Sequence, residues 1–253
     1  MLRILTYNIL DGGGNREALL LEVLRAKAPD VVILQEVFEA GLLAEFATAM
    51  GMHYFFAKGN SIRHLGLLSR YPIRSPRSHN PFPIRCAILE AQIELEAGPP
   101  LQIIGIHLAP FVAWYREIWR ALELRIILRL ASQYANKPLL IAGDCNAIAP
   151  NDRVEWVDSI PPWLKWMLRL QGGRVFHVAI RRILTAGYTD SFRYVHPAVD
   201  GFTLPTPEPH ARLDYIFVND HLRPKLQNCE VVRDVPDVDR ASDHYPVLGE
   251  FVF

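Results

Sequence analysis

The sequence of 253 residues lacks several features that define common protein classes. Its three cysteines, Cys86, Cys145 and Cys229, are odd in number and far apart, so they encode neither a disulfide framework nor a zinc site. No apolar run approaches the roughly 18 residues of a membrane-spanning helix. The 27 basic and 27 acidic residues cancel, so the chain has no overall basic charge of the kind that a sequence-independent nucleic-acid binder usually carries.

Two further absences concern export and nucleotide binding. Met1 is followed directly by the strand-like segment LRILTYNIL, without the charged and apolar segments and the cleavage site of a signal peptide. With its isolated cysteines, this start predicts a cytoplasmic protein. The run Gly12-Gly13-Gly14 is not followed by Lys and then Ser or Thr, so it fails the pattern of a phosphate-binding P-loop.

The sequence does contain the pattern of a folded α/β chain. Half of its residues are hydrophobic and 21% are charged, as in globular proteins, and residues 1–253 fit a single domain. Apolar spacing predicts helices over 15–28, 38–50 and 113–135. Strands are predicted over 2–10, 30–37, 53–58, 65–70, 85–95, 101–109, 138–147, 211–219, 226–235 and 245–253. Strands alternate with helices early and follow short turns later, which favours a mixed-sheet α/β sandwich.

Polar residues recur where the predicted apolar strands end. The six positions carry Asn8, Glu36, His107, Asp144 with Asn146, Asp214, and Asp243 with His244. A single Asp or Asn at a strand end is most simply a turn former. Carboxylates beside buried strands are costly unless they are paired or bound to a metal, so the recurrence points to a shared site.

The residue types at these positions suit phosphate chemistry. Glu36 and Asp243 offer the hard oxygen ligands that Mg²⁺ prefers. Neighbouring histidines and asparagines could hold and protonate phosphate oxygens. No cluster of cysteines or histidines offers a zinc set.

Seven short motifs carry a resemblance to a known family. They are TYNIL, LQEV, GLLSRYPI, IGIHLAP, GDCNA, RLDYIFV and SDHYPV, which occur in this order between residues 6 and 247. In these motifs the chain resembles the endonuclease/exonuclease/phosphatase superfamily. The resemblance implies a deoxyribonuclease I-like, four-layer α/β sandwich, with two mixed β-sheets packed face to face and helices outside. It places the site at one end of the sandwich.

The resemblance also implies roles for the strand-end residues. Glu36 would be the principal Mg²⁺ ligand, with Asn8 and Asp243 nearby, and Mn²⁺ could substitute. Asp144 would orient or deprotonate the attacking water, and Asn146 would hold the phosphoryl group or that water. His244 would contact a phosphate oxygen, and Asp214 would orient His244. His107 would stabilise the transition state or protonate the leaving oxygen, so these five are the implied catalytic residues. The identity of the general base, Asp144 or His244, stays open.

One departure from the family concerns His107. Repair nucleases of the exonuclease III type place Tyr there, which disfavours an abasic-site endonuclease. In deoxyribonuclease I an acidic residue upstream supports this histidine, whereas the matching stretch here offers Arg63 and His64. These two residues are candidate substrate-binding residues or loop-surface residues, and the partner of His107 stays open.

The expected function is that of a Mg²⁺-dependent hydrolase of phosphate esters, a phosphodiesterase in which a metal-assisted water attacks phosphorus in line. Nucleic acid, a phospholipid or a small phosphodiester could be the substrate, and no obligate protein partner is expected. The alternatives are a phosphomonoesterase of the same fold and a non-catalytic binding module.

A Trp- and Arg-rich excursion at about 150–205 is the most distinctive part of the chain. It holds Trp156, Trp163 and Trp166, and helical spacing places Trp163, Trp166, Met167 and Leu170 on one face. Three interpretations stay open. The segment could pack as a cover or lid, contact a membrane through residues 161–184, or stack on nucleic-acid bases.

Overall fold

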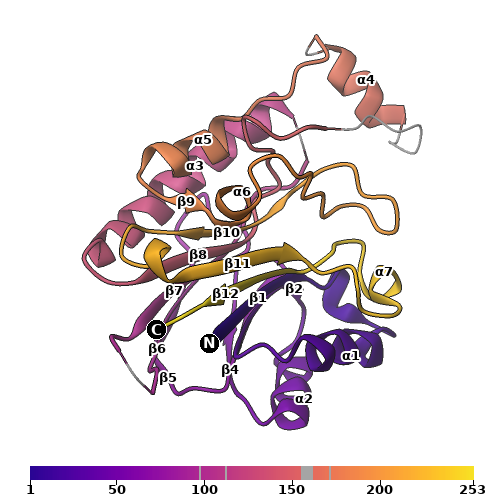
Figure 1. Cartoon of the computed structure of the whole chain (residues 1–253). Helices are drawn as coiled ribbons and strands as arrows, with labels where there is room; N and C mark the ends of the chain where they lie inside the picture. Colours follow the sequence, from indigo (N-terminus) through magenta and orange to yellow (C-terminus); the bar gives the residue numbers. More distant parts are fainter. Residues whose placement is uncertain (97, 112, 155–161, 171) are drawn as a thin grey trace.

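The computed structural model describes residues 1–96, 98–111, 113–154, 162–170 and 172–253, and for 163, 164, 167 and 168 only the backbone. Two mixed six-stranded sheets lie face to face (Figure 1). The first sheet contains, in spatial order, β11 (Leu226–Val231), β12 (Val247–Phe251), β1 (Leu2–Asn8), β2 (Val31–Val37), β4 (His64–Ser69) and β3 (His53–Ala57). The second contains β5 (Ile73–His79), β6 (Ile88–Ile93), β7 (Leu101–His107), β8 (Leu139–Asp144), β10 (Asp214–Val218) and β9 (Thr189–Asp190).

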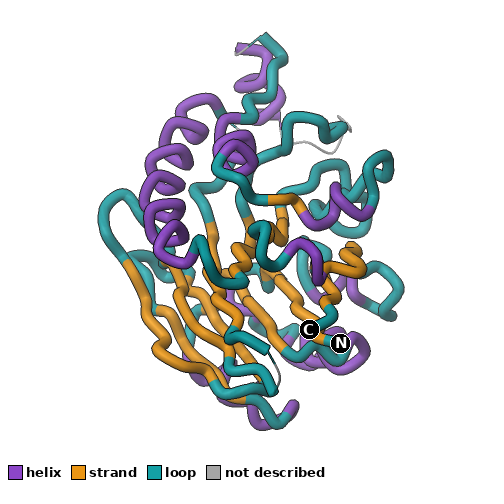
Figure 2. The backbone as a smooth tube through the Cα atoms, turned by 60° about the vertical axis from the view of Figure 1, so that its left-hand side comes forward, coloured by secondary structure: helices purple, strands orange, loops and turns teal. Residues whose placement is uncertain are grey.

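Helices cover the outer face of each sheet, as the ribbon and tube views show (Figures 1 and 2). Helices α1 (Glu17–Lys27), α2 (Ala40–Met50) and α7 (Val238–Ala241) pack on the first sheet, and α3 (Trp114–Ala131) and α5 (Val178–Thr185) on the second. The shorter helices are α4 (Pro162–Leu170), α6 (Ser191–Val195) and the 3-10 turns η1 (Asp11–Gly13), η2 (Ser132–Tyr134) and η3 (Arg223–Lys225). The predicted four-layer sandwich is therefore confirmed.

The core between the sheets follows from the alternation of side chains along each strand. Ile4 and Ile33 of the first sheet belong to the same buried cluster as Ile103 and Ala142 of the second. The opposite faces of the strands pack against the helices, so the strands carry near-continuous apolar runs.

Strand register brings the polar strand ends together. The parallel strands β7 and β8 place His107 beside Asp144, and the antiparallel strand β10 begins with Asp214 beside the same Asp144. Gly143 allows this close pairing, because a Cβ at that position would lie 1.9 Å from the Ile106 carbonyl oxygen.

Two parts of the fold differ from the sequence-based expectation. Strand β5 was not predicted, because it is a polar, largely exposed edge strand, and it contains Pro76, which edge strands tolerate. In residues 151–209, α6 and β9 were not predicted, whereas α4 matches the helical spacing of Trp163 to Leu170 and is followed by a second short helix, α5. Trp156 and the side chains of Trp163 and Met167 lie outside the described residues. None of the described helices is long and apolar enough to cross a membrane.

Candidate active site

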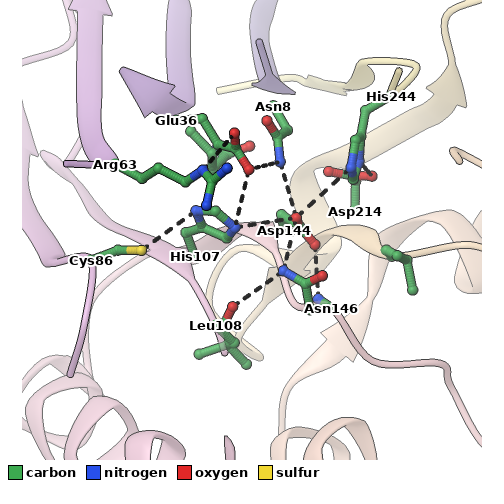
Figure 3. Close-up of polar contacts among 12 residues, drawn as sticks. Asn8, Glu36, Arg63, Cys86, His107, Leu108, Asp144, Asn146, Asp214 and His244 are labelled. Atoms are coloured by element: carbon green, nitrogen blue, oxygen red, sulfur yellow. Dashed lines mark hydrogen bonds and ion pairs between the residues drawn. The ribbon is translucent and has the colours of Figure 1, made fainter. Parts of the chain in front are cut away.

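The polar strand ends converge where the two sheets meet, as the close-up shows (Figure 3). Asn8 and Glu36 come from β1 and β2 of the first sheet, and His244 from the loop before β12. The second sheet contributes His107, Asp144 and Asp214 at strand ends, with Asn146 just beyond β8.

Asp144 lies at the centre of this cluster and is almost fully buried. Its Oδ2 accepts hydrogen bonds from Asn8 Nδ2 at 3.1 Å and Asn146 Nδ2 at 3.0 Å, and its Oδ1 accepts from the Asn146 backbone N–H at 2.8 Å. Burial acts to raise the pKa of Asp144, but the adjacent imidazoles of His107 and His244 outweigh it and lower that pKa. Asp144 is therefore held as a carboxylate.

His244 is fixed by Asp214. Its Nδ1 lies 2.8 Å from Asp214 Oδ2, which also accepts from the Thr203 hydroxyl at 2.6 Å. Burial opposes protonation of His244, but the negative charges of Asp214 and Asp144 raise its pKa to about 10. The other ring nitrogen, Nε2, faces Asp144 Oδ2 at 4.0 Å, so a protonated His244 presents its second N–H to the centre of the site.

His107 flanks Asp144 from the other side. Its Nε2 lies 3.4 Å from Asp144 Oδ2 and 3.9 Å from Glu36 Oε1. Burial acts to lower the pKa of His107, but the hydrogen bond to Asp144 overcomes this and raises it. Its Nδ1 lies 3.6 Å from the Cys86 sulfur. Cys86, which sequence reasoning missed, is the partner of His107, and no sequence spacing signals this contact.

Glu36 enters the site through a local distortion of β2. The pairing of β2 with β4 shifts register between Gln35 and Val37, and Glu36 itself has φ +63°. Such a bulge re-aims a side chain out of the ladder, and a left-handed conformation in a non-glycine residue is typical of functional sites. Asn146, with φ +48°, has the same left-handed conformation.

Both carboxylate oxygens of Glu36 already have contacts. Oε1 accepts from Asn8 Nδ2 at 3.4 Å, and Oε2 accepts from the Asp11 backbone N–H at 2.8 Å and from Arg63 Nε at 3.0 Å. Arg63 also pairs with the Asp11 carboxylate. The structure thus brings Arg63 to the rim of the cluster, beside Glu36.

The structure does not bring His64 into the cluster. The ring is buried, its Nδ1 accepts from the Gly59 backbone N–H at 3.0 Å, and it packs edge-on against Phe56. These contacts assign His64 to packing of β4 rather than to a surface that substrate could reach.

Asp243 adjoins the cluster through the loop that carries His244. Ser242 Oγ donates to the Asn8 carbonyl oxygen at 2.6 Å, which ties this loop to the end of β1. Burial raises the pKa of Asp243, and the negative charges of Glu36, Asp144 and Asp214 add to the increase. Four carboxylates therefore share one region.

The donor set fits a divalent cation that prefers oxygen ligands. Asp144, Asp214 and His244 each offer a ligand atom within 4.8 Å of the others, a group that differs from the expected ligands Glu36, Asn8 and Asp243. Among the described residues, buried Asp214 Oδ1 has no hydrogen-bond partner. Because buried acceptors are rarely left unpaired, this oxygen is consistent with a ligand or proton donor at the site.

Comparison with known proteins places this chain in a family. The sequence model of the Endonuclease/Exonuclease/phosphatase family matches residues 5–244. The chain therefore belongs to this family, whose members hydrolyse phosphoester bonds. No curated protein sequence matches the chain.

Solved structures show the same fold at low sequence identity. The 3′ phosphatase NExo from Neisseria, bound to a product DNA hairpin, has a TM-score of 0.76 and 21% identity over 100% of both chains. An AP endonuclease from Archaeoglobus fulgidus has a TM-score of 0.75 and 19% identity over 100% of both chains. A humanized TDP2 from D. rerio has a TM-score of 0.70 and 18% identity, covering 100% of this chain and 99% of the other.

Proposed function

We propose that the chain is a Mg²⁺-dependent phosphodiesterase in which water attacks phosphorus in line. The observation that carries this proposal is the buried Asp144 carboxylate, which lies between the imidazoles of His107 and His244. The Nδ1 atom of each imidazole contacts a second side chain, Cys86 for His107 and Asp214 for His244. A base flanked by two cationic donors can accept a proton from water while the donors stabilise charge on phosphate oxygens.

Each side chain then has one task. Asp144 accepts a proton from the attacking water, which Asn146 helps to hold. His244, oriented by its contact with Asp214 at Nδ1, donates from Nε2 to a non-bridging phosphate oxygen. His107 donates from Nε2 to the leaving oxygen.

The proposed metal ligands are Glu36, Asn8 and Asp243, and Mn²⁺ is the expected substitute for Mg²⁺. The bound cation would supply Lewis-acid neutralisation of the phosphate charge. The crowding of Glu36 and Asp243 with Asp144 and Asp214 supports a cation here, because burial and these negative charges raise the pKa of Asp243 and a bound cation would offset the charges. Arg63 partly fills this role for Glu36.

We further propose that residues 1–253 form one catalytic domain. The family match over residues 5–244 supports this, since it extends across both sheets. The substrate class is a phosphate diester of nucleic acid, phospholipid or small-molecule type. A phosphate monoester is the second candidate, because one structural neighbour is described as a 3′ phosphatase.

A substrate panel with Mg²⁺ tests the proposal. It comprises plasmid, single-stranded oligonucleotide, abasic duplex, sphingomyelin, inositol phosphates and a bis-aryl phosphate. We expect turnover of a diester that chelator abolishes and Mg²⁺ or Mn²⁺ restores. Asp144→Asn should lower kcat by on the order of 10²–10⁴ with the fold intact by circular dichroism. Chelator-resistant turnover, or wild-type kcat in Asp144→Asn, would refute the mechanism.

A further inference from the structure

Helix α3 presents an apolar stripe to solvent. The sequence groups Trp114, Ile118 and Leu122 on one helical face, and in the structure these side chains are 54%, 56% and 45% exposed. Tyr115, next to Trp114, is 45% exposed. Helix α3 also packs Leu124, Ile127 and Ala131 against the second sheet, so the exposed stripe is a second apolar face that the core does not use.

The inward face of α3 shows why the helix cannot rotate. It carries Glu117, Arg120 and Glu123, all buried. Arg120 binds Glu117 Oε1 through Nη2 at 2.7 Å and the Ala109 carbonyl oxygen through Nη1 at 2.7 Å. Glu123 Oε2 accepts from the Ala109 backbone N–H at 3.0 Å. Rotation of α3 would leave buried charges without partners, at a cost that the apolar stripe could not offset.

The other end of the exposed stripe is positively charged. Leu122 is followed at helical spacing by Arg125 and Arg129, both exposed. The two acids of α3 are the buried Glu117 and Glu123, so α3 contributes only positive charge to the surface.

The neighbouring helix α5 extends this surface. Helix α5 packs against α3, with Arg182 Nη1 donating to the Ala121 carbonyl oxygen. Residues 162–189 contain five cationic side chains and no acid.

The surface also adjoins the candidate active site. Trp119 of α3 and the exposed Phe82 stack edge to face, with ring centroids 5.7 Å apart. They line a hollow of about 550 Å³ together with Arg116 and Arg85. Arg85 directly precedes Cys86, the partner of His107, so this hollow lies beside the His107 side of the site.

We propose that this face, made by the outward residues of α3 and the neighbouring α5, docks on an anionic lipid bilayer. We call it the α3 face. Aromatic and aliphatic side chains would enter the headgroup boundary while arginines meet anionic headgroups, the combination that drives binding of interfacial helices. Docking holds the active site next to the lipid surface.

Charge and residue type favour lipid over two other occupants. A second copy would oppose one cationic face to another, which costs rather than gains free energy. Single-stranded nucleic acid binds through cations and stacking aromatics, whereas Ile118 and Leu122 have no planar group to stack on a base.

Vesicle sedimentation of the full chain tests the proposal and needs no turnover, so its outcome is separate from that of the proposed hydrolase activity. We expect the chain to sediment with phosphatidylcholine vesicles that contain phosphatidylglycerol and much less with phosphatidylcholine alone. Ile118→Gln with Leu122→Gln should abolish binding, and Arg125→Gln or Arg129→Gln should each lower the partition coefficient about fivefold.

Matched control variants lie on the far side of the molecule. Tyr54→Gln on β3 removes a similarly exposed apolar side chain, and Arg25→Gln on α1 removes an exposed arginine. Both should bind vesicles like the wild type. The proposal is overturned if anionic vesicles fail to bind the chain, or if the Ile118 and Leu122 variants still bind. It also fails if the same residues instead support dimerisation or oligonucleotide binding in the absence of lipid binding.

Discussion

The sulfur of Cys86 lies 3.6 Å from Nδ1 of His107, on the side of the ring opposite Asp144. The thiol can donate to a neutral imidazole and accept from a protonated one, so it keeps the ring aligned in both states. A cysteine side chain thus stands beside Nδ1, in the position where a carboxylate would form an ion pair.

This contact predicts a positioning role for Cys86. Cys86→Ala removes the partner of Nδ1 and should lower kcat about tenfold, a loss of about 1.4 kcal/mol, with a displaced pH profile for kcat. Cys86→Ser keeps a donor and acceptor and should restore most of the activity. Cys229→Ala, a buried cysteine on β11, is the control. An unchanged profile in Cys86→Ala would exclude the role.

Glu123 predicts a pH-dependent stability. Burial raises its pKa from 4.5 to about 7, although the Ala109 N–H and Arg120 act in the opposite direction. Between these two values the folded state binds more protons than the unfolded state, so this group makes the free energy of unfolding fall as pH rises.

Glu123→Gln removes that titration while keeping an acceptor for the Ala109 N–H. Relative to wild type, the variant should gain stability between pH ~5 and pH ~8, by at most on the order of 3 kcal/mol. Urea unfolding across this range measures the difference. A difference that does not vary with pH would show that Glu123 does not titrate in this window.

Divalent cations should stabilise the folded chain. Binding among Glu36, Asp243 and Asn8 would relieve repulsion between carboxylates, and a cation at 100 times its Kd adds about 2.7 kcal/mol. The Tm should therefore rise with Mg²⁺, and the rise should be lost in Glu36→Gln. An equal rise in the variant would place the cation elsewhere.

Arg63 should compete with that cation, because its Nε lies 3.0 Å from Glu36 Oε2. Arg63→Ala is expected to lower the Mg²⁺ concentration needed for half-maximal activity several-fold, with little effect on unfolding, since exposed ion pairs contribute about 0–1 kcal/mol. Arg70→Ala is the control, because Arg70 is similarly exposed and pairs with Asp30, away from the site. If both variants behave alike, Arg63 does not compete.

The polar residues at the strand ends could be predicted from sequence. Buried strands require apolar residues, so a polar residue at the end of an apolar run is conspicuous. Asn8, His107, Asp144 and Asp214 could be placed together in this way. Glu36 was identified for the same reason, but the bulge that aims it was not, because no residue type requires a bulge there.

Contacts between distant segments could not be predicted. Cys86 contacts His107 only because β6 and β7 pair. The spacing of residue types along the chain does not predict such a contact. The burial of His64 against Phe56 likewise depends on the pairing of β3 and β4. The exposure of the apolar stripe of α3 could not be predicted, because part of the inward face is formed by the paired charges of Glu117 and Arg120, which sequence patterns assign to solvent.

The two faces of helix α3 should differ in the substitutions that they tolerate. For folding, its outward positions Ile118 and Leu122 should accept polar residues, while the inward Glu117 and Arg120, which pair with each other, should accept almost none. A complete substitution scan of α3 scored for folding would show tolerance with a helical period, highest at the exposed apolar positions and lowest at the buried charged and apolar ones. Substitutions that accumulate on the exposed face of α3 could therefore change what this surface binds while every variant along the way still folds.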